Sequence, residues 1–168
     1  MKTRNFLRNG QSVVGEPYRY AECGLDDVFL LNGFVLKETG YGNGVTITDI
    51  DGLHRAIGVF LVHERKTLSP KELRFLRKQM ALTQAELGSK IGLSGQQVAR
   101  WEKGACEIPG PAERMIRIIF AVDHVPEDTR GPLLEDLLAQ LDELTKTDQT
   151  STPKLVLVEA NGSWKRAA

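Results

Sequence analysis

The chain has 168 residues, 41% of them apolar and 26% charged, and its 22 basic side chains balance 22 acidic ones. This composition is typical of a soluble globular protein, and two cysteines are too few for a disulfide scaffold. The sequence has no apolar run of the roughly 20 residues that a membrane span needs and no signal-peptide core, which predicts a cytoplasmic protein without a membrane partner.

The balanced net charge hides an uneven distribution along the chain. Residues 65–120 carry eleven Lys or Arg against five Asp or Glu, whereas residues 123–148 carry two against eight. A basic segment within a neutral chain favours a domain that binds a polyanion, although a solvated helix surface has a similar composition.

The N-terminal part is predicted to be a flexible arm over residues 1–16 and a β-rich domain over residues 17–66. The runs 27–39 and 44–64 are rich in Val, Ile, Phe and Thr, and "VTITDI" alternates as a half-buried strand does. The stretch "TGYGNGV" between the runs is typical of a turn, since Gly and Asn tolerate positive φ. We therefore expect a small antiparallel sheet of about three strands.

Residues 67–125 contain the start signals of four short helices. Capping boxes, in which Ser or Thr is followed three residues later by Glu or Gln, begin at Ser69, Thr83 and Ser94. A fourth helix is predicted to begin near Pro111. The turn at Gly92 is so short that the second and third helices must cross steeply. The helical spacing then turns four side chains toward the core: Leu87, Ile91, Val98 and Trp101.

Residues 126–168 are predicted to form an amphipathic helix, a polar linker and a strand. The helix, over residues 129–146, has six leucines on one stripe and acidic residues opposite. The stripe either packs on its own domain or forms a dimer seam. The strand "KLVLVEA" extends a sheet of this chain or of a partner.

The stretch 73–104 resembles the Cro/Xre-type helix-turn-helix regulators of bacteria and phages, because "LTQAEL", "IGLS" and "VARWEKG" have that family's order and spacing. The resemblance implies an α+β protein in which the β-rich domain precedes a lambda repressor-like DNA-binding domain. It also implies double-stranded DNA as a partner and a homodimer that reads two half-sites. Gly88 replaces the usual alanine at the helix crossing, which would cost the helix about 1 kcal/mol.

The family implies a role for each matching residue. The helix over residues 95–103 would lie in the major groove, where glutamine pairs with adenine and arginine with guanine. Arg77 and Glu102 match a structural ion pair. The residues matching base-reading positions are Gln96, Gln97 and Arg100, and Gln97 is ambiguous because capping competes with base contact. The residues matching phosphate-contact positions are Thr83, Gln84, Ser94 and Lys103.

The N-terminal stretch "YRYAECGLDDVFLLNG" resembles the zinc-binding domain of MqsA-like antitoxins but lacks its cysteine pairs. A structural zinc site needs about four Cys or His ligands, and only Cys23, His54 and His63 are available here. We therefore expect no metal and no cofactor. "GYGNG" lacks the Gly-Lys-Ser/Thr ending of a phosphate loop, and no other catalytic motif is present, so we expect no enzyme.

The sequence leaves three functions open. The first is a stand-alone dimeric repressor that binds a specific DNA sequence and whose sheet senses a ligand or only dimerises. The alternative is the antitoxin of a type II toxin-antitoxin module, which would neutralise a toxin protein and regulate its own operon. A module used only for protein contact would have no salt-dependent affinity for DNA.

Overall fold

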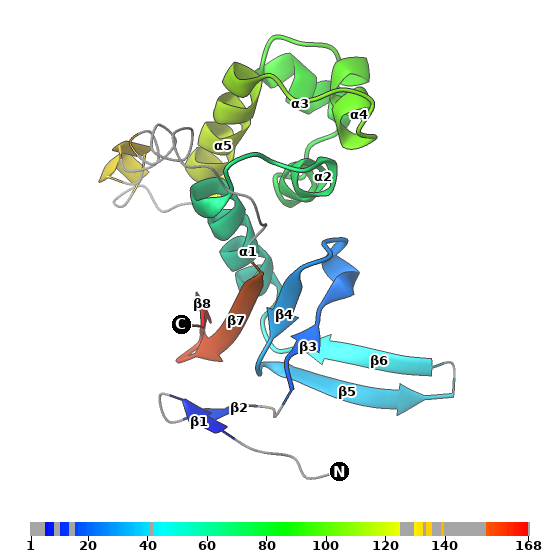
Figure 1. Cartoon of the computed structure of the whole chain (residues 1–168), viewed down its shortest axis with the longest axis vertical. Helices are drawn as coiled ribbons and strands as arrows, with labels where there is room; N and C mark the ends of the chain where they lie inside the picture. Colours follow the sequence, from blue (N-terminus) through cyan, green and yellow to red (C-terminus); the bar gives the residue numbers. More distant parts are fainter. Residues whose placement is uncertain are drawn as a thin grey trace. The chain divides into compact units, whose positions relative to one another are not determined.

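The computed structural model describes residues 6–8, 11–13, 16–40, 42–124, 130–132, 134–135, 139 and 154–167. The chain divides into two compact units, of which the first combines Met1–Ala56 with Pro153–Ala168 and the second is Ile57–Thr152. The fold is α+β, with strands before the helices and a strand pair after them (Figure 1).

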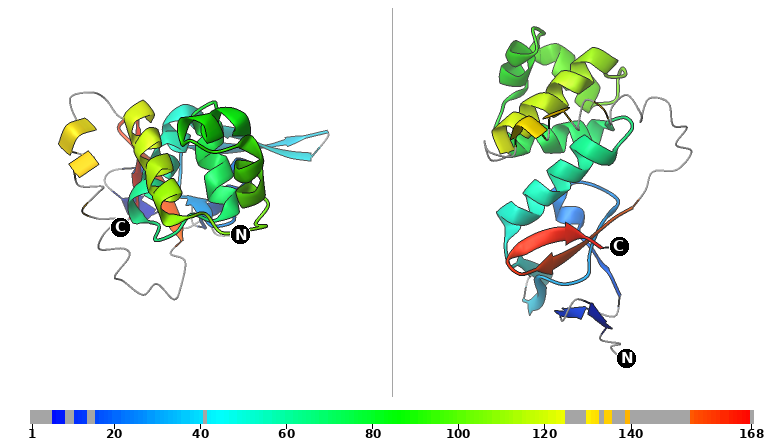
Figure 2. Two further views of the ribbon diagram at one scale, coloured as in Figure 1. Left: turned by 90° about the horizontal axis from the view of Figure 1, so that it is seen from above. Right: turned by 90° about the vertical axis from the view of Figure 1, so that its left-hand side faces the viewer.

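A four-stranded sheet forms the centre of the first unit. Its order is β3-β4-β7-β8, so the C-terminal hairpin completes a sheet begun near the N-terminus. β4 and β7 are parallel, with Val28 opposite Leu155, and they lie side by side in Figures 1 and 2. The predicted terminal strand therefore extends a sheet of its own chain. The N-terminal strands pair antiparallel as predicted, but this sheet has four strands rather than about three, and its β4–β7 pair is parallel. The strands are β3 (Tyr18–Arg19), β4 (Val28–Leu30), β7 (Leu155–Ala160) and β8 (Ser163–Arg166).

Two hairpins accompany this sheet. β1 (Phe6–Arg8) pairs with β2 (Gln11–Val13) inside the segment expected to be a loose arm. β5 (Phe34–Thr39) pairs with β6 (Gly42–Ile47), as the turn signal between them predicts. A single 3-10 turn, η1 (Ala21–Cys23), precedes β4.

Helix α1 (Ile50–Glu64) corrects the prediction that this stretch forms strands. Asp49 caps it, since its Oδ1 accepts a hydrogen bond from the Gly52 amide at 2.9 Å. Leu53, Ile57 and Leu61 recur every four residues and are all buried. The high content of β-branched residues suggested strands, but this helical period allows one face to be buried continuously.

The second unit contains four further helices at the predicted places, seen from above in Figure 2. They are α2 (Pro70–Gln79), α3 (Gln84–Lys90), α4 (Gly95–Glu102) and α5 (Gly110–His124). The capping boxes at Ser69 and Thr83 are complete. At Ser94 only half of the box forms: the hydroxyl accepts from the Gln97 amide. The buried apolar residues include Leu73, Leu76, Leu87, Val98, Trp101, Ile116 and Phe120.

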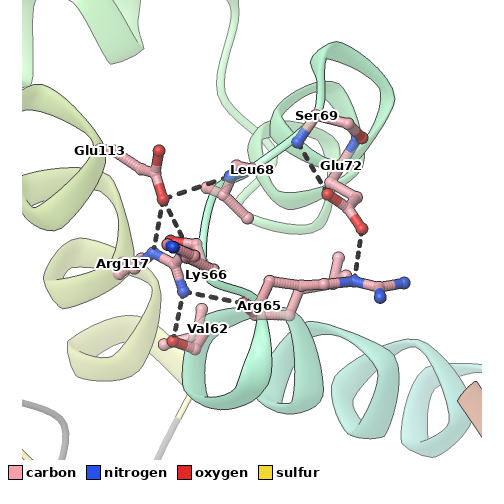
Figure 3. Close-up of polar contacts among 9 residues, drawn as sticks. Val62, Arg65, Lys66, Leu68, Ser69, Glu72, Glu113 and Arg117 are labelled. Carbon is pink, nitrogen blue, oxygen red and sulfur yellow. Dashed lines mark hydrogen bonds and ion pairs between the residues drawn. The ribbon is translucent and has the colours of Figure 1, made fainter. Parts of the chain in front are cut away.

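A buried arginine of α5 joins the helices of this unit (Figure 3). Arg117 is fully buried, and its Nη1 donates to the carbonyl oxygens of Leu61 and Val62 at 3.0 and 2.7 Å. These carbonyls belong to the last turn of α1, which has no intrahelical donors for them. Glu113, one turn earlier on α5, accepts from Arg117 and from the Leu68 amide.

A second buried ion pair fixes the connection between α1 and α2. Arg65 Nε lies 2.7 Å from Glu72 Oε1, and both side chains are less than a tenth exposed. The other oxygen of Glu72 accepts from the Ser69 amide in the capping box. The ion pairs Arg65–Glu72 and Glu113–Arg117 therefore hold the connection over residues 65–69 to α2 and to α5 (Figure 3).

The predicted amphipathic helix over residues 129–146 falls largely outside the described residues. Those that are described, 130–132, 134–135 and 139, are helical. The leucine stripe and its two interpretations thus stay predictions.

We expect the substitution Glu113→Ala to lower the free energy of unfolding by about 3–5 kcal/mol, because it leaves Arg117 buried without a carboxylate. Urea unfolding of the variant and of the wild type measures this difference. Glu107→Ala removes an exposed carboxylate of the same unit and serves as the control. Equal losses in the two variants would contradict the role assigned to Glu113.

Candidate nucleic-acid interface

Helices α3 and α4 approach each other so closely that glycine is needed on both. A Cβ atom on Gly88 would lie 2.8 Å from the Leu93 carbonyl oxygen, and one on Gly95 would lie 2.8 Å from Ala85 Cα. Gly92, in the turn between them, has φ +74°, where glycine is favoured. The close approach gives a reason for Gly88 that helix propensity alone does not.

The predicted ion pair between α2 and α4 is present and has two parallel bonds. Arg77 Nε and Nη2 donate to Glu102 Oε1 and Oε2 at 2.5 and 2.9 Å. Arg77 Nη1 also donates to the Leu82 carbonyl oxygen at 2.8 Å. Gln84 Nε2 donates to Glu102 Oε2 at 2.8 Å. One carboxylate therefore fixes the end of α4 to α2 and to the start of α3.

These contacts change the acidity of Glu102. Burial alone would raise its pKa, but hydrogen bonds from Arg77 and Gln84 and the charges of Arg77 and Arg74 outweigh burial and lower the pKa. The ionised form is thus the one that the fold stabilises.

Most of the predicted contact residues lie on the surface of the second unit. Val98 and Trp101 point inward and are buried, so Trp101 is a core residue rather than a stacking platform. The hydroxyls of Thr83 and Ser94 cap α3 and α4. The exposed residues are Gln96 and Arg100 of the base-reading set and Thr83, Ser94 and Lys103 of the phosphate set.

The two remaining glutamines are half-buried and make contacts within the protein. Gln84 is bonded to Glu102. Gln97 Nε2 donates to Cys106 Sγ at 3.5 Å, a contact that the sequence did not indicate because Cys106 lies beyond the end of α4. In this arrangement Gln97 is directed toward Cys106, whereas Gln96 and Arg100 are exposed.

Helix α2 adds a basic surface that was not among the predicted site residues. Lys71, Arg74 and Lys78 are all exposed. Their spacing of three and four residues places them on one helix face, and this spacing is readable from the sequence once α2 is recognised.

The candidate metal ligands of the first unit have other contacts. Cys23 Sγ donates to the Tyr20 carbonyl oxygen at 3.1 Å, and His54 Nε2 lies 2.9 Å from the Tyr20 hydroxyl. Burial lowers the pKa of His54. Among the described residues, no three His, Cys, Asp or Glu side chains are grouped as metal ligands. Within the same residues, no helix is long and apolar enough to cross a membrane.

Comparison with known families identifies a helix-turn-helix domain of the Cro/C1 type over residues 73–125. This range runs from α2 to the residue after α5, and it supports a DNA-binding transcription regulator. The match ends short of the N-terminal unit and does not bear on its predicted resemblance to MqsA-like antitoxins. Comparisons with curated proteins and with solved structures gave no match.

We expect Glu102→Gln to remove part of the decrease in unfolding free energy that the wild type shows as the pH is lowered. Because the folded-state pKa of Glu102 is lowered, its stabilising effect is complete above the ordinary carboxyl pKa and is lost as pH falls through the lowered value. At neutral pH the variant should lose about 1.5–3 kcal/mol of unfolding free energy. Urea unfolding between pH 3 and 7 measures both proteins.

The difference in unfolding free energy between Glu102→Gln and the wild type should become smaller as the pH is lowered. The exposed Glu107→Gln is the control and should show little difference at any pH. A difference for Glu102→Gln that stays constant across the range would show that this carboxylate is not the titrating group.

Proposed function

We propose that the chain is a sequence-specific transcription regulator that represses by occupying promoter DNA, through a DNA-binding domain over residues 67–125. The observation that carries this proposal is the exposed polar surface of α4, which includes Gln96 and Arg100. On the opposite face of the helix, Val98 and Trp101 are buried in the core.

In this proposal α4 enters the major groove, with its N-terminal half against the base edges. Arg100 would donate two hydrogen bonds to O6 and N7 of a guanine, and Gln96 would pair with an adenine. Gln97 is a weaker candidate for base contact than these two, because its amide is directed toward Cys106. The ion pair between Arg77 and Glu102 would keep α4 in position during binding.

The proposed phosphate contacts lie around this helix and set its register. The starts of α3 and α4 carry Thr83, Gln84 and Ser94, where backbone amides and the positive ends of the helices favour an anion. Lys103 follows the end of α4 and adds an exposed positive charge. Such contacts contribute affinity without reading sequence.

We also propose that the regulator acts as a homodimer. One α4 helix reads only a few base pairs, and two copies related by a twofold axis would read both halves of a palindromic site. The recovered site should then contain two half-sites with centres about 34 Å apart, which is one turn of DNA.

Selection from a library of random duplexes tests the function. The full chain should enrich a shared, palindromic motif, and its affinity for that motif should fall steeply as salt is added. Failure to enrich any motif would contradict sequence-specific binding. Enrichment of an asymmetric single half-site would contradict the dimer.

We expect Arg100→Ala to weaken binding to the selected site by about 1–3 kcal/mol and to relax the preference at one base position. Fluorescence anisotropy with the selected duplex and its single-base variants measures both effects. Arg114→Ala removes an exposed arginine of α5 and is the control. An unchanged base preference in Arg100→Ala would exclude it as a base-reading residue.

We expect Lys103→Gln to weaken binding to selected and random duplexes by the same factor. The slope of log K against log salt concentration should become less steep by about 0.9, because one phosphate contact is lost. Titrations of both duplexes at several salt concentrations measure this change. A loss confined to the selected duplex would assign Lys103 to base reading instead.

A further inference from the structure

Helix α2 presents a face of positive charge that the proposed DNA contacts do not use. Lys71, Arg74 and Lys78 are exposed along it. The helix has one acidic residue, Glu72, which is buried and paired with Arg65 on another side. The exposed face of α2 therefore carries three positive charges and no negative one.

The helical geometry relates this face to α3 and α4. With about 100° between successive residues, Arg74 lies about 60° from Arg77 around the axis of α2. Arg77 points to Glu102 at the end of α4, so Arg74 occupies the adjacent strip of α2 surface. Measured around the same axis from Arg74 and away from Arg77, Lys78 lies at about 40° and Lys71 at about 60°.

The charges of Arg74 and Arg77 have different surroundings. The charge of Arg74 acts on the Glu102 carboxylate, which accepts a hydrogen bond from Gln84 at 2.8 Å. Arg77 is neutralised by Glu102 at close range, whereas Arg74 has no hydrogen bond or ion pair among the described residues. Its charge is thus available to an external anion at the exposed face of α2.

We infer that the DNA-binding surface extends from α3 and α4 onto α2, and that Arg74 and Lys78 contact backbone phosphates flanking the bases read by α4. The inference rests on the proposed function and names additional contacts for it. The phosphates of one DNA strand form a matching row of anions, since each strand carries one charge about every 3.4 Å along the helix axis. These contacts would add affinity and salt dependence without changing sequence preference.

The plainest alternative is that these side chains only solvate an exposed helix. Both interpretations predict a folded variant, since neither side chain is buried. They differ in the dependence of DNA affinity on salt, because a solvated side chain releases no counterions from DNA. The salt slope is therefore the decisive readout.

The experiment compares the wild type with the double variant Arg74→Gln/Lys78→Gln, by anisotropy titration at four or more salt concentrations. The probes are the duplex selected by the wild type and a random duplex of equal length. The control is Arg55→Gln/Lys165→Gln, which removes two exposed positive charges from the first unit. Thermal unfolding checks that all three proteins are folded.

We expect the slope of the double variant to become less steep by about 1.8, which is 0.9 for each lost contact, with an unchanged ratio of selected to random affinity. An unchanged slope would overturn the inference while leaving the proposed function intact. An equal change in the control would also overturn it, because net charge alone would then explain the effect. Absence of selective, salt-dependent binding by the wild type would instead overturn the proposed function.

Discussion

The packing of the second unit depends above all on the hydrogen bonds and ion pair of the buried Arg117 guanidinium. The guanidinium replaces the water that the carbonyl groups of Leu61 and Val62 would otherwise bind at the end of α1. Burying an arginine is costly unless its charge and its donors are satisfied, and Glu113 supplies the opposite charge. Because Glu113 also accepts from the Leu68 amide, the same pair sets the path of the chain into α2.

The helix-turn-helix depends on two further constraints of different kinds. Gly88 and Gly95 let the backbones of α3 and α4 meet, which no larger residue allows without a shift. The Glu102 carboxylate then links α4 to α2 and α3 by charge-assisted hydrogen bonds. Packing brings the helices together and the ion pair fixes their orientation, so the exposed face of α4 is held rigidly before any ligand binds.

This arrangement separates the side chains that hold α4 in the core from the exposed ones that the proposed function assigns to DNA contact. Val98 and Trp101 are buried, while Gln96 and Arg100, on the opposite side, are exposed. A substitution on the exposed side therefore leaves the packing of the domain intact. The N-terminal unit is built differently, since its sheet is completed only by the C-terminal strand pair.

The helices α2 to α5 lie where the sequence predicted them, because helix caps and a glycine turn are local signals. Of the four predicted core positions, Leu87, Val98 and Trp101 are buried, whereas Ile91, the C-terminal cap of α3, is only half-buried. The β-branched residues of α1 predicted strands there, but the stretch is a helix whose buried side recurs every four residues at Leu53, Ile57 and Leu61. Three features became known only from the folded chain: the pairing of β4 with β7, the direction of Gln97 toward Cys106, and the partners of Arg117. Each of these joins residues that are not neighbours in one element, and no local propensity encodes such a contact.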